Sequence, residues 1–420
     1  MIDDAQDGDG EFYTRPGYGT AKVDGNTSRG GKMAERVTIG MIGCGGMMGA
    51  HERGFRELWD KGIRNFEIVA TCDLVKSLAE KMADQVGGWQ GKRPRVYSDV
   101  ETMLKSEPDM MAVDVVTVHR AHHSVVVPCF EAGKHVTVEK PLAITLRAGK
   151  LMLDAAEKAG KVFQVAENYR RSTENRAIKW AIDSGMIGKL RMIYWVDVEE
   201  RLWYWTWRDH RDQAGGGWPL DGGVHFADLF RYHVGDPESL YCTVRTYNPF
   251  RYKDTDNLTG PIPVDVEDTT LAVLHFADGV TGSWTYTLSG PGDKWGHRAV
   301  YGEHGSLTWG TGFKSRKTSM TMEELIAEHH RAIGPDGVEK LFPRGIQDTI
   351  ATELNEFVEA VLHGTPIEIT GWEGYKDQAI SMALYESDAA GRPVLLSDIE
   401  ALRLEAYQGR LNADLEGLAR

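Results

Sequence analysis

The sequence predicts an α/β protein with two domains, of which the first is built on a parallel sheet and the second on a large, open, mostly antiparallel sheet. Between residues 37 and 160, apolar strand-like runs alternate with helix-like segments, as a parallel sheet with helical crossovers requires. Beyond residue 160 the strand-like runs are longer and alternate in polarity, and Asp278-Gly279 marks a hairpin turn. The length of 420 residues exceeds that of one ordinary core.

The first strand, Val37–Ile42, ends in a glycine-rich turn, Gly43 to Gly46, and a helix-compatible segment follows. Such glycines permit a tight turn and a close approach to a pyrophosphate, whose charge the helix N-terminus then stabilises. The order of strand, turn and helix is that of a Rossmann dinucleotide-binding domain, although glycines also make ordinary turns. Met48 stands where a small residue is usual and Gly49 follows it, so we expect a looser or shifted helix–strand contact.

The second strand, Phe66–Cys72, is followed by the carboxylate of Asp73. An acid at this place accepts hydrogen bonds from the adenosine ribose and repels a 2′-phosphate, which favours NAD over NADP. The neighbouring Lys76 leaves NADP possible. Asp73 can also be the N-cap of the next helix.

Further strand-like runs complete the first domain: Arg95–Tyr97, Met110–Val118 and Lys134–Glu139, with a short candidate at Val162–Val165. Ligands of open parallel sheets bind beyond the carboxyl ends of the strands. Four residues fall at such ends: Gly43, Asp73, Thr117 and Lys140. Because Pro141 holds the preceding residue extended, Lys140 is expected at a fixed position at its strand end.

The second domain is predicted from longer patterns. Expected strands are Met192–Val198, Leu202–Trp207, a hairpin within Leu271–Leu288, Ala299–Tyr301 and Leu307–Trp309, and expected helices are Thr349–Leu362 and Tyr375–Asp388. Within one strand, Trp203, Trp205 and Trp207 would share a face. We interpret that face as a subunit interface or sheet packing, and the alternative is stacking on a sugar. A homo-oligomer, dimer or tetramer, is therefore expected.

The composition limits the partners and the compartment. The net charge of −14 argues against nucleic-acid and anionic-membrane partners. The four cysteines are far apart in the sequence, which predicts buried thiols in a reducing compartment. No apolar run reaches the roughly 18 residues of a membrane span and the first residues lack a signal core, so a cytoplasmic protein is expected. Residues 1–36 are rich in Gly, Asp, Thr and Ser, which predicts a flexible or subunit-wrapping tail.

Asp221 and His225 are the strongest candidates for chemistry, because four residues apart on a helix they would share one face. A histidine can accept an alcohol proton near neutral pH, and a carboxylate beside it can orient the ring. The alternative is a helix in which Asp221 is a cap and His225 a core residue. Lys140 is a candidate for binding the substrate hydroxyl. Adjacent histidines without matching carboxylates give no reason to expect a metal.

Together these segments resemble the Gfo/Idh/MocA oxidoreductase family. The resemblance is carried by Gly43-Cys44-Gly45-Gly46 with His51, by Thr117 to His122, by Glu139-Lys140-Pro141 and by Asp221-x-x-x-His225, and it extends from Val37 to about Leu396. It implies a Rossmann domain, a second domain whose open sheet often forms the oligomer interface, and NAD(P)-dependent oxidation or reduction of a sugar, cyclitol or related alcohol. Met48 and Val118-His119, where Pro-Asn is common, depart from the family pattern.

The resemblance also implies roles for individual residues. His225 would take the hydroxyl proton, Asp221 would orient it, and Lys140 would hold the reacting oxygen. The implied cofactor-binding residues are Gly43, Cys44, Gly45, Gly46, Met47, Met48, Asp73, Thr117, His119, His122, Glu139 and Lys140. The implied substrate-binding residues are Lys140, Tyr169, Arg170, Asp221, His225 and Asp228.

The predicted function is hydride transfer between NAD, or possibly NADP, and a carbinol carbon of a carbohydrate-type small molecule. Two alternatives remain at this point. One is a glycoside-processing enzyme that uses NAD transiently, and the other is a non-catalytic NAD-binding regulator. The expected domains are residues 37–160 for the cofactor and residues 161–420 for substrate binding and oligomerisation.

Overall fold

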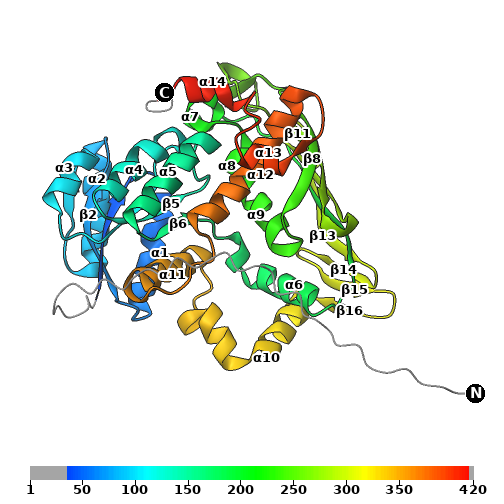
Figure 1. Cartoon of the computed structure of the whole chain (residues 1–420), viewed down its shortest axis with the longest axis horizontal. Helices are drawn as coiled ribbons and strands as arrows, with labels where there is room; N and C mark the ends of the chain where they lie inside the picture. The colour runs from blue at the N-terminus through cyan, green and yellow to red at the C-terminus, as the bar shows by residue number, and fades with distance from the viewer. Residues whose placement is uncertain (1–35, 416–420) are drawn as a thin grey trace, which may run out of the picture. The chain divides into compact units, whose positions relative to one another are not determined.

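The computed structural model describes residues 36–415, which contain two large sheets and the helices that cover them (Figure 1). The predicted tail, residues 1–36, lies outside the described residues apart from Arg36. Across residues 36–415, no helix has the length and apolar character that a membrane crossing needs.

The first sheet is parallel and has six strands in the order β3-β2-β1-β4-β5-β6, which confirms the predicted Rossmann architecture. Its strands are β1 (Val37–Ile42), β2 (Phe66–Cys72), β3 (Arg95–Tyr97), β4 (Ala112–Val115), β5 (His135–Glu139) and β6 (Phe163–Ala166). Its helices are α1 (Met48–Asp60), α2 (Lys76–Gln90), α3 (Val100–Ser106), α4 (His122–Glu131) and α5 (Leu146–Ala159). Every residue of β4 is buried, because helices cover both faces of the sheet.

The parallel sheet extends past residue 160, where the sequence predicted its end. β6 pairs with β5 in this sheet, so the short strand expected at Val162–Val165 belongs to the cofactor domain. The late helix α11 (Thr349–His363) also packs here, since Leu354 and Phe357 are buried in the same cluster as Phe55 of α1. Figure 1 shows α11 beside α1 although nearly 300 residues separate them.

The second sheet has nine strands in the order β16-β15-β14-β13-β7-β12-β11-β8-β17, and all its pairs are antiparallel except β7 with β12. Its strands are β7 (Leu190–Val198), β8 (Pro237–Arg245), β11 (Thr269–Phe276), β12 (Thr281–Thr287), β13 (Trp295–Gly302), β14 (Gly305–Thr308), β15 (Gly312–Ser315), β16 (Ser319–Thr321) and β17 (Val394–Leu395). A separate hairpin is formed by β9 (Phe250–Asp254) and β10 (Thr259–Pro263). The predicted mostly antiparallel sheet and the β11–β12 hairpin are therefore confirmed.

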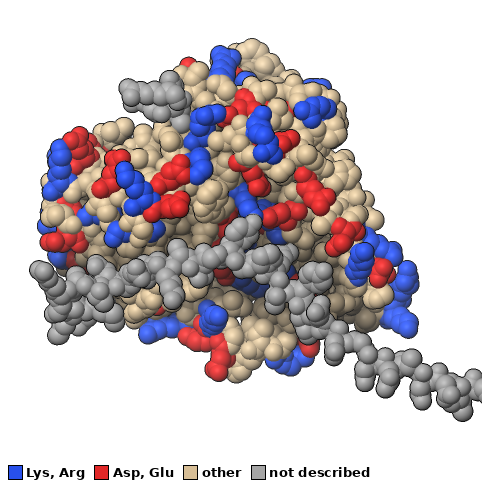
Figure 2. Space-filling view, viewed as in Figure 1, with Lys and Arg blue, Asp and Glu red and all other residues tan. Residues whose placement is uncertain are grey.

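One face of this sheet packs on helices and the other is exposed. Trp195 and Trp284 are buried against Phe226 and Phe230 of α9 (Val224–His233). The remaining helices are α6 (Thr173–Asp183), α7 (Arg211–Ala214), α8 (Trp218–Asp221), α10 (Met322–Leu341), α12 (Gly371–Ala390), α13 (Leu396–Glu400) and α14 (Gln408–Ala413). On the opposite face, Tyr194, Tyr241, Leu271 and Val273 are exposed on neighbouring strands. In the view of Figure 2, acidic and basic side chains are interspersed over the surface.

The segment Leu202–Trp207 is not a strand, so the predicted shared face of the three tryptophans does not exist. β7 ends at Val198, and a short 3-10 helix, η3, covers Thr206–Asp209. The buried carboxylate of Asp209 accepts a hydrogen bond from the Trp205 backbone N–H at 2.5 Å and pairs with Arg201 at 2.6 Å. These bonds curl the backbone around Asp209 instead of extending it.

Candidate active site and cofactor site

The glycine turn after β1 has the shape that a bound pyrophosphate needs. Gly43 has φ +86°, and a Cβ there would lie 2.3 Å from the Val116 carbonyl oxygen, so a side chain is excluded. Gly45 and Gly46 are exposed, and nothing lies within 4 Å of where their Cβ atoms would be. α1 begins directly afterwards without a side-chain cap, so no side chain occupies the N-terminal end where a phosphate would bind. These residues therefore fit a dinucleotide.

Asp73 is fixed beside this turn at the end of β2. Its carboxylate accepts hydrogen bonds from the backbone N–H of Cys44 and of Val75, each at 2.7 Å. Asp73 is not the N-cap of α2, because Val75 has that position, and the bond to Val75 forms a local turn before the helix. The bond to Cys44 holds the acid beside the glycine turn. Burial and the nearby Asp73 raise the pKa of the Cys44 thiol to about 12. Met48 is fully buried and fills the helix–strand contact, so Met48 offers a cofactor only its backbone.

A buried chain of polar groups connects α1 with Lys140. His51 bonds Asp114 at 2.9 Å through Nδ1 and Glu139 at 3.1 Å through Nε2. The second Glu139 oxygen accepts the backbone N–H of Lys140 at 2.9 Å. Burial lowers the pKa of His51, but the two carboxylates outweigh it and hold that pKa well above its usual range. The sequence motifs contained His51 and Glu139 but gave no sign of Asp114.

Lys140 and Asp221 meet, although they come from different parts of the chain. The Lys140 Nζ donates to the Asp221 backbone oxygen at 2.7 Å and lies 3.9 Å from its carboxylate. The same carboxylate lies 3.1 Å from His119 Nε2 and 3.3 Å from Arg208 Nε. Burial raises the pKa of Asp221, yet Lys140, His119 and Arg208 together hold it far below its usual value. Asp221 is therefore a permanent carboxylate.

Asp221 and His225 do not share a helix face, which corrects the sequence prediction. Asp221 ends α8, and His225 begins the first turn of α9 after Gly222 and Gly223. A Cβ at Gly222 would lie 2.5 Å from the Trp218 ring, so this link between the two helices has no room for a side chain. His225 Nδ1 instead lies 2.7 Å from both carboxylate oxygens of Glu167. Glu167, and not Asp221, orients the histidine.

Glu167 follows β6, at the carboxyl edge of the parallel sheet. Burial raises the pKa of its carboxyl. The charge and the hydrogen bond of His225 lower this pKa by more than burial raises it, so the net shift is downward. Tyr169 stacks on the His225 ring with a centroid distance of 3.8 Å and an interplanar angle of 1°. Tyr169 is 40% exposed, so it can face a substrate as predicted. The rule of strand ends, applied to the candidate strand at Val162–Val165, would have pointed to Glu167.

Four predicted binding residues are occupied by other contacts. Asp228 is fully buried and paired with Arg170 through two hydrogen bonds, so neither is presented freely to a substrate. His122 is fully buried, and its ring nitrogens face the carbonyls of Pro141 and Thr117. Burial lowers the pKa of His122 to about 4, which makes it a neutral structural residue. Thr117 is half-buried and bonds the Val118 carbonyl.

The tryptophan segment lines the Asp221 side of the site. The Arg208 guanidinium lies over Trp205 and Trp207, at 4.9 and 4.3 Å from their ring centroids. His119 packs edge-on against Trp207 at 4.7 Å, and its Nδ1 bonds the Ala214 carbonyl at 2.8 Å. The tryptophans therefore hold Arg208 and His119 against Asp221. The sequence prediction placed His119 at the cofactor and did not include Arg208.

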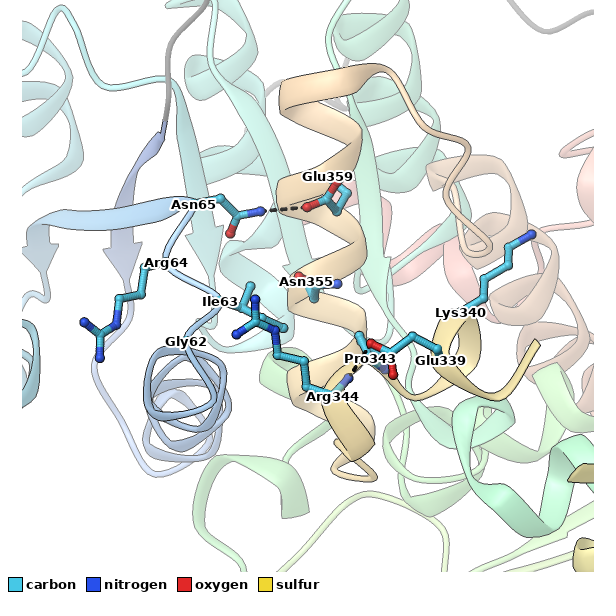
Figure 3. A pocket seen from close by; sticks show the side chains of 10 residues that line it. All are labelled: Gly62, Ile63, Arg64, Asn65, Glu339, Lys340, Pro343, Arg344, Asn355 and Glu359. Carbon is cyan, nitrogen blue, oxygen red and sulfur yellow. Dashed lines mark hydrogen bonds between the residues drawn. The ribbon is translucent and has the colours of Figure 1, made fainter. Parts of the chain in front are cut away.

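A surface cavity of about 480 Å³ lies elsewhere, between the loop before β2, the end of α10 and α11 (Figure 3). It includes the Asn65 side chain, which donates to Glu359 at 2.7 Å, and Arg344, whose backbone N–H donates to Glu339. None of the predicted site residues lines it. We therefore identify the candidate site from the contacts among Lys140, Asp221, Glu167 and His225, and not from this cavity.

Comparison with known proteins agrees with this geometry. The oxidoreductase family model with an NAD-binding Rossmann fold matches residues 37–167, and the GFO/IDH/MocA C-terminal domain model matches residues 175–308. Levoglucosan dehydrogenase of Pseudarthrobacter phenanthrenivorans is 27% identical over 390 residues, which cover 84% of this chain and 97% of that protein. Myo-inositol 2-dehydrogenase of Thermotoga maritima is 25% identical over 376 residues, which cover 86% of this chain and 99% of that protein.

A solved structure extends the comparison to the cofactor. Levoglucosan dehydrogenase in complex with NADH matches with a TM-score of 0.69 at 25% identity, covering 86% of this chain and 99% of that one. The NAD-binding domain and the NADH-bound relative identify NAD(H) as the cofactor. The chain belongs to the Gfo/Idh/MocA family of NAD-binding oxidoreductases and is related to the levoglucosan and inositol dehydrogenases.

Proposed function

We propose that this protein transfers a hydride between NAD and a carbinol carbon of a sugar, glycoside or cyclitol. The observation that carries the proposal is the contact of Lys140 with Asp221, 2.7 Å from Nζ to the backbone oxygen. This contact joins the end of a cofactor-domain strand to the segment that holds His225. A cation, a fixed carboxylate and a histidine then stand together beyond the strand ends, where ligands of such sheets bind.

Each of these side chains has a chemical task in alcohol oxidation. Bound NAD supplies the hydride acceptor. Lys140 donates a hydrogen bond to the substrate hydroxyl oxygen and stabilises the negative charge that develops on it. Because Glu167 occupies Nδ1 of His225, Nε2 takes the hydroxyl proton as the hydride leaves the same carbon. In the reverse direction the histidine returns this proton to a carbonyl oxygen.

Asp221 supports the reaction without taking the proton. Its carboxylate stays ionised between Lys140, His119 and Arg208, and its contact with the Lys140 ammonium holds that group in place. The exposed ring of Tyr169 offers an aromatic face to the apolar side of a sugar or cyclitol ring.

The test is a screen with purified protein, NAD and a panel that includes levoglucosan, myo-inositol and methyl glucosides, with NADH followed by absorbance. We expect stoichiometric NADH formation with at least one compound. Lys140→Met should lower kcat roughly 10²- to 10⁴-fold. Lys105→Met, a surface lysine on α3, is the matched control and should retain normal rates.

Three results would contradict the proposal. If no compound of the panel reduces NAD, the dehydrogenase assignment fails. If a glycoside is consumed without net NADH release, the transient use of NAD followed by elimination replaces it. A Lys140→Met protein with normal turnover would refute the assigned site while leaving the fold untouched.

A further inference from the structure

We propose that Glu167 is the positioning residue of the general base: it fixes the His225 ring and stabilises the imidazolium formed when Nε2 takes the substrate proton. This proposal concerns the site of the proposed dehydrogenase reaction, and its kinetic test rests on that reaction. Neither the sequence motifs nor the family comparison assigns a role to Glu167.

The hydrogen bond between the two residues sets the tautomer of His225. Both Glu167 oxygens lie 2.7 Å from His225 Nδ1, and the Glu167 side chain is almost fully buried. The lowered pKa of Glu167 keeps it a carboxylate, which only accepts hydrogen bonds. Nδ1 must therefore carry the hydrogen, and in the neutral ring Nε2 is left as the acceptor for the substrate proton.

The carboxylate is itself held in place by the η2 turn (Tyr169–Arg171) that follows β6. The Tyr169 backbone N–H donates to Glu167 Oε1 at 3.1 Å, and the Arg171 guanidinium donates to the Glu167 backbone oxygen. The ring of the same Tyr169 stacks on His225. One turn thus fixes both the partner of the histidine and the plane of its ring.

Within residues 36–415, the other charges that act on Glu167 or His225 face partners of their own. Asp228 pairs with Arg170, and Glu353 lies 3.9 Å from Arg171. Asp221 is bound by Lys140, His119 and Arg208 and lies on the far side of the Gly222-Gly223 break. Glu139 interacts with the charge of His225 but is committed to His51 and to the Lys140 backbone. Lys140 carries a positive charge, which helps to keep the Glu167 carboxylate ionised and cannot stabilise an imidazolium. Glu167 is therefore the carboxylate that bonds the His225 ring, and Tyr169 is the ring that stacks on it.

The kinetic test compares Glu167→Gln with wild type on the best compound of the screen. Gln keeps an acceptor for Nδ1 but removes the charge, so the imidazolium is less stable. We expect kcat to fall roughly 10²-fold with little change in KM. We also expect the acid limb of the kcat profile to move to lower pH. Glu167→Asp keeps the charge at a greater distance and should return the limb toward its wild-type position. Glu101→Gln on the surface of α3 is the matched control and should behave as wild type.

A second measurement does not depend on a substrate. In protein with ¹³C-labelled histidine and saturating NADH, the His225 signal is the one missing from His225→Gln. Its titration midpoint should be about one pH unit or more lower in Glu167→Gln than in wild type. Circular dichroism and NADH affinity should be unchanged, which separates the charge effect from loss of structure.

The outcomes separate the two proposals. Equal titration midpoints in wild type and Glu167→Gln would overturn the role of Glu167 even if the dehydrogenase activity is confirmed. A loss of kcat with an unmoved acid limb would also overturn it, because it would indicate a merely structural ion pair. A shifted midpoint in a protein that oxidises no compound of the panel would support the pair and refute the proposed reaction.

Discussion

We expect Glu267 to make the free energy of unfolding depend on pH between about 4.5 and 7. Its buried carboxyl accepts hydrogen bonds from the Tyr385 hydroxyl at 2.6 Å and from the Gly217 backbone N–H at 2.9 Å. Gly217 precedes α8, which ends at Asp221, so Glu267 supports the active-site segment. Burial raises the pKa of Glu267 from 4.5 to about 7, although the hydrogen bonds it accepts oppose this rise.

The sign and size of the effect follow from this shift. Below pH 4.5 the carboxyl is protonated in both the folded and the unfolded chain, and it contributes no pH dependence. Between 4.5 and 7 the unfolded chain loses the proton while the folded protein keeps it, so the free energy of unfolding falls as pH rises. At about 1.4 kcal/mol per pH unit, the loss reaches roughly 3 kcal/mol at pH 7 and above.

The assay is urea unfolding of wild type and Glu267→Gln from pH 5 to pH 8. Gln imitates the protonated carboxyl and cannot ionise, so all other titrating groups cancel in the difference between the two proteins. As the pH rises across this range, we expect the free energy of unfolding of Glu267→Gln to increase relative to that of wild type by roughly 2 to 3 kcal/mol. If the two stability curves run parallel, the carboxyl does not titrate there and the reasoning is refuted.

Three further predictions concern the cofactor and the exposed sheet. Asp73→Ser should raise kcat/KM with NADP relative to NAD, and a wild type that already prefers NADP would contradict the placement of Asp73. Gly43→Ala should lower the melting temperature and abolish tight NADH binding, because its Cβ would lie 2.3 Å from a carbonyl oxygen. Gly45→Ala is the control for Gly43→Ala. Nothing lies within 4 Å of a Cβ at Gly45, so the melting temperature should be unchanged. If the exposed face of the second sheet joins subunits, Leu271→Asp should reduce the mass measured by light scattering, and a monomeric wild type would refute that interface.

The sequence by itself determined the features that local chemistry decides. The apolar run before Gly43 could only be a strand leading into a turn that excludes side chains, and Asp73 and Lys140 follow from the ends of strands with the same direction. Such features need only neighbouring residues, because backbone conformation and strand polarity are fixed within a few positions. The two sheet types were predictable for the same reason.

Only the tertiary structure decided which side chains become partners. Glu167 and His225 are 58 positions apart, and no periodicity connects them. The four-residue spacing of Asp221 and His225 suggested a helix face, but α8 ends at Asp221 and α9 begins at Val224, and the Gly223 N–H donates back to the Trp218 carbonyl at 2.7 Å. Arg208 likewise reaches Asp221 only because Asp209 curls its segment. Burial and charge at these contacts arise from segments that meet only when both sheets have formed, so spacing along the chain could not specify them.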